Sequence, residues 1–179
     1  MRKAIDQQLS KMDEELRLLL DRMKSYSDNT LNQSPGAGHW SVLQIMQHLM
    51  LAEQLSLNYV KKKLSYQPKL PHSGLGSRFR IALLNFYQLL PLKFKAPTNV
   101  GDEKLKTNRT LADISAEWLN NRAQLRSYLN ELPDELFHKA VYKHPFAGRL
   151  SLGGMLSFFS GHFGRHRKQI ERTLQALSL

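Results

Sequence analysis

Histidine is the residue type whose spacing in this sequence best suits chemistry. The chain has seven histidines. His162 and His166 lie four residues apart on the apolar stripe of one segment with helical periodicity, and His48 lies on the stripe of another. Residues four apart project from one face of a helix, about 6 Å apart along its axis. Two imidazoles at this spacing can share a metal ion, and a third from a facing helix would complete a three-histidine site.

A three-histidine site would give this chain a way to make a nucleophile. Zinc binds imidazole nitrogen at about 2.0–2.1 Å and leaves a fourth position for water. Neutral imidazoles leave the full positive charge on the ion, which acidifies a bound water or thiol toward neutral pH. The chain contains no cysteine that could act as the nucleophile itself. A second interpretation stays open, because single histidines on apolar stripes are often hydrogen-bonded core residues, and periodicity does not show that His48 faces the other two.

Two glutamines lie close to these histidines in the sequence. Gln44 precedes His48 by one helical turn, and Gln169 follows His166 by three residues. Either amide could orient a ligating imidazole from behind. The alternatives are a helix cap for Gln44 and a polar residue at the bundle boundary for Gln169.

Four long segments with helical periodicity must position these side chains. They cover about residues 2–25, 41–65, 110–132 and 151–177, and Ser41, Thr110 and Ser151 are suitable N-caps for the last three. Few segments show strand alternation. The sequence therefore predicts an all-α protein, a four-helix bundle in a single domain that spans residues 1–179.

The connections between the predicted helices differ in length. Residues 27–40 form a loop rich in Ser, Asn, Gly and Pro, and residues 134–151 are irregular or briefly extended. Residues 66–109 form a long crossover that contains four prolines and three glycines. A structureless loop of that length is uncommon in a compact domain, so we predict a short extra helix over about residues 77–90, ended by Pro91.

The composition narrows the function classes. Twenty-six Lys and Arg against 15 Asp and Glu give a net charge of +11. The basic residues are scattered, which disfavours a nucleic-acid-binding protein, whereas a basic surface suits small anionic substrates. The longest apolar stretch is too short and too interrupted to cross a membrane, and the N-terminus lacks the apolar region of a signal peptide. We expect a cytoplasmic protein.

Two motifs carry a resemblance to a known family. HWSVLQIMQHL at residues 39–49 resembles the second-helix motif of the DinB-like superfamily, in which Trp, Ser, an acidic or amide residue and a ligand His followed by Leu occur in this order. The family's fourth helix and its approach are matched by His144, Pro145, Gly148, Ser151, His162, His166, Gln169 and Ile170. The sequence FKAP at residues 94–97 resembles one branch of the family.

The resemblance implies a four-helix bundle with a three-histidine metal site, often in a homodimer. Carried over by position, the metal ligands are His48, His162 and His166, and the ion is a divalent metal, Zn or Ni. Two positions depart from the family pattern. Arg165 stands where the family often has a second His, and Gln44 stands where Glu is common.

The resemblance also implies an enzyme that acts on a small-molecule substrate. Some branches of the family transfer low-molecular-weight thiols such as bacillithiol or glutathione, and others resemble hydrolases. We therefore expect a metal-dependent thiol S-transferase or hydrolase. The alternative is a non-enzymatic, stress-related protein that binds a metal or small molecule on the same bundle.

Overall fold

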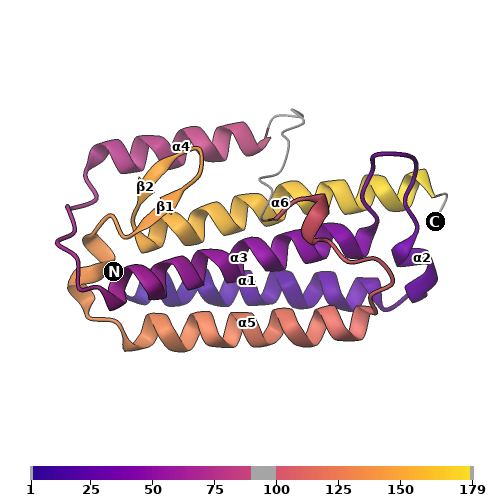
Figure 1. Ribbon diagram of the computed structural model, residues 1–179, viewed down its shortest axis with the longest axis horizontal. Helices are drawn as coiled ribbons and strands as arrows, with labels where there is room; N and C mark the ends of the chain where they lie inside the picture. Colours follow the sequence, from indigo (N-terminus) through magenta and orange to yellow (C-terminus); the bar gives the residue numbers. More distant parts are fainter. Residues whose placement is uncertain (1, 90–99, 178–179) are drawn as a thin grey trace.

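Four long helices lie side by side along the length of the molecule (Figure 1). They are α1 (Arg2–Met23), α3 (Val42–Ser65), α5 (Leu111–Glu131) and α6 (Leu152–Ala176). The structure is a computed structural model that describes residues 2–89 and 100–177. This architecture confirms the predicted all-α four-helix bundle.

The N-termini of three of these helices are closed by the predicted caps. The hydroxyl of Ser41 accepts from the backbone N–H of Gln44, and the Gln44 side chain accepts from the backbone N–H of Ser41, which completes a capping box. Thr110 and Ser151 accept from backbone N–H groups at the starts of α5 and α6. Such caps satisfy backbone donors that have no partner within the helix, so each helix has a defined start.

Shorter elements occupy the connections. The first connection, predicted as a loop, contains the short helix α2 (Asp28–Asn32), whose N-cap is Ser27. The segment predicted as irregular or briefly extended contains the 3-10 helix η2 (Asp134–His138) and an antiparallel hairpin of β1 (Tyr142–His144) and β2 (Gly148–Leu150). Gly148 has φ of +70°, a conformation that glycine adopts without steric cost at the end of the turn.

The crossover contains the predicted extra helix. Helix α4 (Leu75–Leu89) starts two residues earlier than expected. The 3-10 helix η1 (Asp102–Lys104) lies near the end of the crossover. The predicted last residue of the extra helix, Leu90, and the FKAP sequence lie outside the described residues. In Figure 1, α4 runs back along the bundle, so that α3 and α5 point in the same direction. A Cβ atom on Gly154 would lie 3.2 Å from Ile81 Cγ1, so glycine lets α4 pack close against α6.

The buried apolar side chains form two clusters, one toward each end of the bundle. The cluster near the hairpin includes Leu9, Leu57, Leu125, Phe158 and Phe159. The cluster near α2 includes Leu16, Ile45, Leu49, Trp118, Phe163 and Ile170. On each of the four long helices, the residues of one cluster are separated along the chain from those of the other by a short stretch that contains polar side chains.

One group of these polar side chains is a buried ion pair. Glu53 and Arg122 are 5% and 4% exposed, and Arg122 Nη2 donates to Glu53 Oε1 at 2.7 Å. Trp118 Nε1 donates to the other carboxylate oxygen at 3.0 Å. Burial disfavours the charged guanidinium, but the attraction of Glu53 and Asp13 outweighs it and raises the pKa of Arg122. Arg122 therefore stays charged where it joins α5 to α3.

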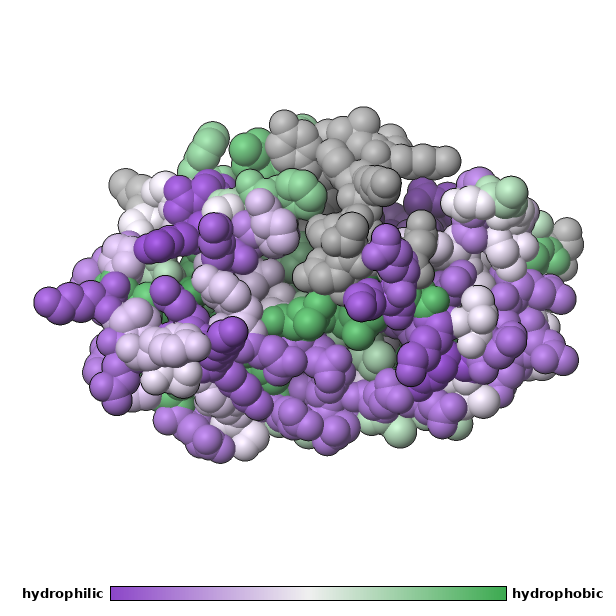
Figure 2. Space-filling model, viewed as in Figure 1, coloured by the Kyte–Doolittle hydropathy of each residue, from purple (hydrophilic) through white to green (hydrophobic). Residues whose placement is uncertain are grey.

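The surface on the face shown in Figure 2 is mostly hydrophilic. Hydrophilic residues cover the lower edge, where α5 lies, and hydrophobic residues gather at the upper edge, where α4 lies. Among the helices of the described residues, none has an apolar stretch that could cross a bilayer.

Replacement of Arg122 by Leu should lower the free energy of unfolding by about 3–5 kcal/mol, because it leaves the Glu53 carboxylate buried without its counter-charge. Urea denaturation followed by circular dichroism measures the change. Arg126→Leu is the matched control. Arg126 pairs with Asp13 at a more exposed site, so its loss should cost less than about 1 kcal/mol. Equal losses in the two variants would contradict a dominant role for the buried pair.

Candidate metal centre

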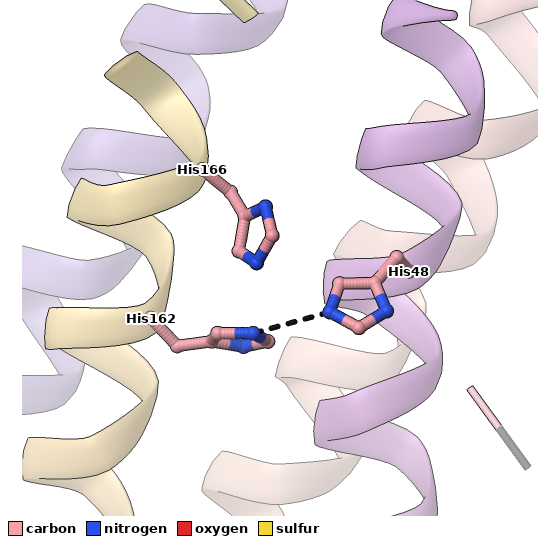
Figure 3. Close-up of side chains that lie close together, drawn as sticks. All are labelled: His48, His162 and His166. Atoms are coloured by element: carbon pink, nitrogen blue, oxygen red, sulfur yellow. Dashed lines mark hydrogen bonds between the residues drawn. The ribbon is translucent and has the colours of Figure 1, made fainter. Parts of the chain in front are cut away.

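Three histidines from two facing helices point toward one another (Figure 3). His48 comes from α3, and His162 and His166 come from successive turns of α6. One nitrogen from each ring lies within 4.8 Å of the other two. The side chains of His48 and His166 are 4% and 9% exposed, and His162 is half-buried. The structure thus brings together the three histidines that the sequence singled out, and they lie close enough to bind one metal ion.

A backbone carbonyl fixes the tautomer of His48. Its Nδ1 lies 2.7 Å from the carbonyl oxygen of Val100. A carbonyl only accepts hydrogen bonds, so Nδ1 carries the proton, and the neutral ring presents the lone pair of Nε2 to the other histidines. Val100 lies just before η1, so the end of the crossover orients this imidazole from behind.

The tautomer of His166 is fixed in the same way by Gln169. Nδ1 of His166 lies 2.7 Å from Gln169 Oε1, which leaves Nε2 as the lone-pair nitrogen. Gln169 therefore occupies the position expected of a residue that orients the ring. Gln44 takes the other role considered for it, because its side-chain oxygen belongs to the capping box of α3, and no hydrogen bond among the described residues joins it to the histidines.

The spacing of the ring nitrogens fits a shared ion. His48 Nε2 and His162 Nε2 are 3.1 Å apart. Two nitrogens bound tetrahedrally at 2.0–2.1 Å would lie about 3.3 Å apart, so little movement is needed. His162 also stacks on Phe158, with the ring centroids 5.1 Å apart and the planes 19° from parallel. The phenyl ring holds the imidazole on the inner side of α6.

All three rings are neutral at physiological pH. Burial lowers the pKa of His48, and it lowers the pKa of His166 to about 3, with the charge of His48 adding to the effect. Burial and the neighbouring histidines lower the pKa of His162 well below its ordinary value. Arg165 also disfavours protonation of His162 and His166. Metal binding needs the neutral imidazole, so the environment keeps the lone pairs available.

Three other histidines and the carboxylates of α5 lie away from this cluster. His39 is exposed, and its Nδ1 contacts the carbonyl of Ala37. His72 contacts Lys139, and His138 is exposed. The carboxylates of the third long helix are also on the surface, with Glu117 paired to Arg109.

Three features in and around the site are not predicted by the sequence analysis. Val100 acts through its carbonyl, which every residue type carries, so no sequence signal marks it. Glu53 and Arg122 did leave a signal, because each is a charged residue at a helical spacing that otherwise places apolar residues in the core. The burial of His144, which is 4% exposed, was also missed, since a loop residue was expected there.

The chain is a four-helix bundle with a histidine cluster between its second and last long helices. Comparison with known protein families shows which class of helical bundle this is. The model of the DinB superfamily matches residues 11–170. The chain belongs to this superfamily, as the two motifs predicted.

Two proteins of Bacillus subtilis are similar to this chain. The uncharacterized protein YuaE of strain 168 is 24% identical over 151 residues, which cover 84% of this chain and 87% of YuaE. The structure of YfiT aligns with a TM-score of 0.62 at 17% identity and covers 99% of this chain and 90% of YfiT. YfiT is described as a probable metal-dependent hydrolase with an unusual four-helix bundle topology. At this identity the likeness shows a shared fold.

Protein purified without a histidine tag and reconstituted with Zn or Ni should bind about one ion per chain, because two of the three imidazoles are already oriented to present Nε2. The triple variant His48→Ala, His162→Ala, His166→Ala should bind none at this site. Mass spectrometry of the metal content measures both. His72→Ala, at a surface histidine, is the matched control and should bind like the parent. Undiminished binding by a folded triple variant would place the ion elsewhere.

The free energy of unfolding of the metal-free protein should fall at acidic pH partly because of His144. Burial lowers the pKa of His144 from 6.5 to about 4. The imidazole of residue 144 takes up a proton at a higher pH in the unfolded chain than in the folded chain. Its contribution to stability is therefore complete above about pH 6.5 and is lost as the pH falls toward 4. The loss is at most about 1.4 kcal/mol per pH unit.

Urea denaturation with a chelator present, at pH 7.5 and pH 5, tests this dependence. The parent should lose about 1–2 kcal/mol more than His144→Asn between the two pH values. Parallel losses in the two proteins would show that His144 does not take part.

Proposed function

We propose that the protein is a metal-dependent hydrolase that acts on a small-molecule substrate, with His48, His162 and His166 as the ligands of one divalent ion. The observation that carries the proposal is the pair of hydrogen bonds that His48 and His166 donate from Nδ1 to the oxygens of Val100 and Gln169, which fix the two rings with Nε2 toward a common point. Such bonds behind a ligand are typical of metal centres. A cluster that served the core alone would not need two imidazoles held with their Nε2 lone pairs toward a third ring.

The donor set fits zinc or nickel, since neutral imidazole suits both ions. A divalent ion held there supplies Lewis acidity, which lowers the pKa of a bound water or thiol toward neutral pH. The chain's own contribution is to hold the imidazoles neutral, to shield them on α3 and α6, and to leave the half-buried His162 as the most accessible of the three. The description of YfiT as a probable metal-dependent hydrolase agrees with this proposal.

A second candidate is the transfer of a low-molecular-weight thiol such as bacillithiol or glutathione. The net charge of +11 and the cation of Arg165 beside the histidines of α6 favour an anionic co-substrate. The chain has no cysteine of its own, so the thiol would have to come from a cofactor.

One experiment separates these functions. The Zn- and Ni-loaded protein is assayed with p-nitrophenyl esters for hydrolysis and with monochlorobimane plus glutathione or bacillithiol for thiol transfer, beside the triple histidine variant and His72→Ala. We expect ester hydrolysis that needs the metal, is lost in the triple variant and is kept in His72→Ala.

The other outcomes are equally informative. Thiol transfer without hydrolysis, at a rate that falls as ionic strength rises, would replace the first function with the second. A stoichiometric metal with neither reaction would favour a binding protein, and failure to bind metal would make the histidines structural.

A further inference from the structure

A fourth histidine lies in the same row of aromatic rings as the proposed metal ligands. The ring centroids of His166 and His162 are 4.5 Å apart, those of His162 and Phe158 are 5.1 Å apart, and those of Phe158 and His144 are 4.4 Å apart. Phe158, His162 and His166 recur every four residues on one face of α6, so only one phenyl ring separates His144 from the triad. The row continues to Phe146, which is 73% exposed on the hairpin.

The hairpin fixes the tautomer of His144. Its Nδ1 accepts from the backbone N–H groups of Phe146 and Ala147, at 3.2 and 3.0 Å. A nitrogen that accepts two hydrogen bonds carries no proton, so in the neutral ring Nε2 bears the N–H. This arrangement is the reverse of that in His48 and His166, where Nδ1 is the donor and Nε2 holds the lone pair. His144 is therefore arranged to donate, not to bind a metal.

The donor on Nε2 has no acceptor among the described residues, although the side chain is only 4% exposed. The neighbouring Tyr142 contacts His144 through its ring, while its hydroxyl is hydrogen-bonded to Ser56 Oγ at 3.0 Å, and no hydrogen bond joins it to His144. A buried N–H without a partner costs about 1–3 kcal/mol, so such a group is expected to meet an acceptor when the protein is at work.

The ring stays neutral, because burial lowers the pKa of His144 to about 4. A neutral imidazole donates a hydrogen bond without bringing a second positive charge next to a metal ion. A protonated His144 would repel a cation bound at the triad, because it lies close enough for its charge to influence the titration of His162. The side chain therefore combines a fixed donor with electrical neutrality, close to the proposed centre.

We propose that His144 is a substrate-binding residue whose Nε2–H donates a hydrogen bond to the carbonyl oxygen of an acyl substrate, an ester or an amide, placed along Phe158 beside the histidine triad. This inference rests on the proposed hydrolase function. A neutral donor aimed at a carbonyl oxygen also favours the negative charge that develops there during acyl transfer.

Two variants of His144 test the proposal. Asn places an amide oxygen near the position of Nδ1, so His144→Asn keeps the acceptor for the hairpin and loses the donor. Gln places an amide N–H near the position of Nε2, so His144→Gln restores the donor. Zinc content and circular dichroism at pH 7.5 are measured first, and both variants should match the parent in each.

The first readout does not depend on turnover. In the zinc-loaded parent with ¹⁵N-labelled histidine, acetohydroxamate, a small metal-binding carbonyl compound, should shift the Nε2–H resonance of His144. Its affinity should fall about three- to tenfold in His144→Asn, the size expected for one lost hydrogen bond, and should recover in His144→Gln. The value of kcat/KM for p-nitrophenyl acetate should fall about 100-fold in His144→Asn and by much less in His144→Gln.

The outcomes keep the two proposals apart. A zinc-loaded parent whose Nε2 resonance is unmoved, with equal acetohydroxamate affinity in His144→Asn, would overturn the role of His144 and leave the metal centre intact. A parent that binds no zinc would overturn the proposed function and this inference with it.

Discussion

The ion pair between Glu53 and Arg122 is the contact on which the geometry of the histidine cluster depends. Glu53 lies five residues after His48 on α3, which places the two side chains about 140° apart around the helix axis. One directs α3 toward α5, and the other directs it toward α6. A buried carboxylate tolerates little displacement from its counter-charge, so the rotation of α3 is fixed on one side by charge and the imidazole is presented on the other.

The histidine cluster is a costly arrangement for a core, and its surroundings compensate for the cost. Three imidazoles near the junction of two apolar clusters lose much of their contact with water. In compensation, His48 and His166 donate to Val100 and Gln169, and His48 and His162 are hydrogen-bonded to each other. The same burial holds the rings neutral. The cost in stability and the readiness to bind a cation thus have one physical origin, since both follow from the partial exclusion of water from this layer of the bundle.

Most of the bundle and the three histidines could be predicted from the sequence, because helical periodicity and N-caps are local signals. The spacing of His162 and His166 placed both on one face of α6, but the orientation of His48 toward them depends on the rotation of α3, which periodicity does not define. Helix α2 was missed because five residues give too short a pattern. The Nε2–H donor of His144 depends on two backbone N–H groups of a hairpin turn that donate to Nδ1. Backbone groups are the same in nearly every residue type, so the sequence gives no signal for them.

The bond from His48 to the carbonyl of Val100 has a consequence for how this protein tolerates change. The side chain at residue 100 does not make the contact, so substitutions there preserve it as long as the backbone keeps its path. An insertion or deletion near residue 100 would move the carbonyl by a residue or more and would release the ring from its orientation. At this point the protein is therefore sensitive to the number of residues in the chain rather than to their identity, and a scan by substitution alone would overlook it.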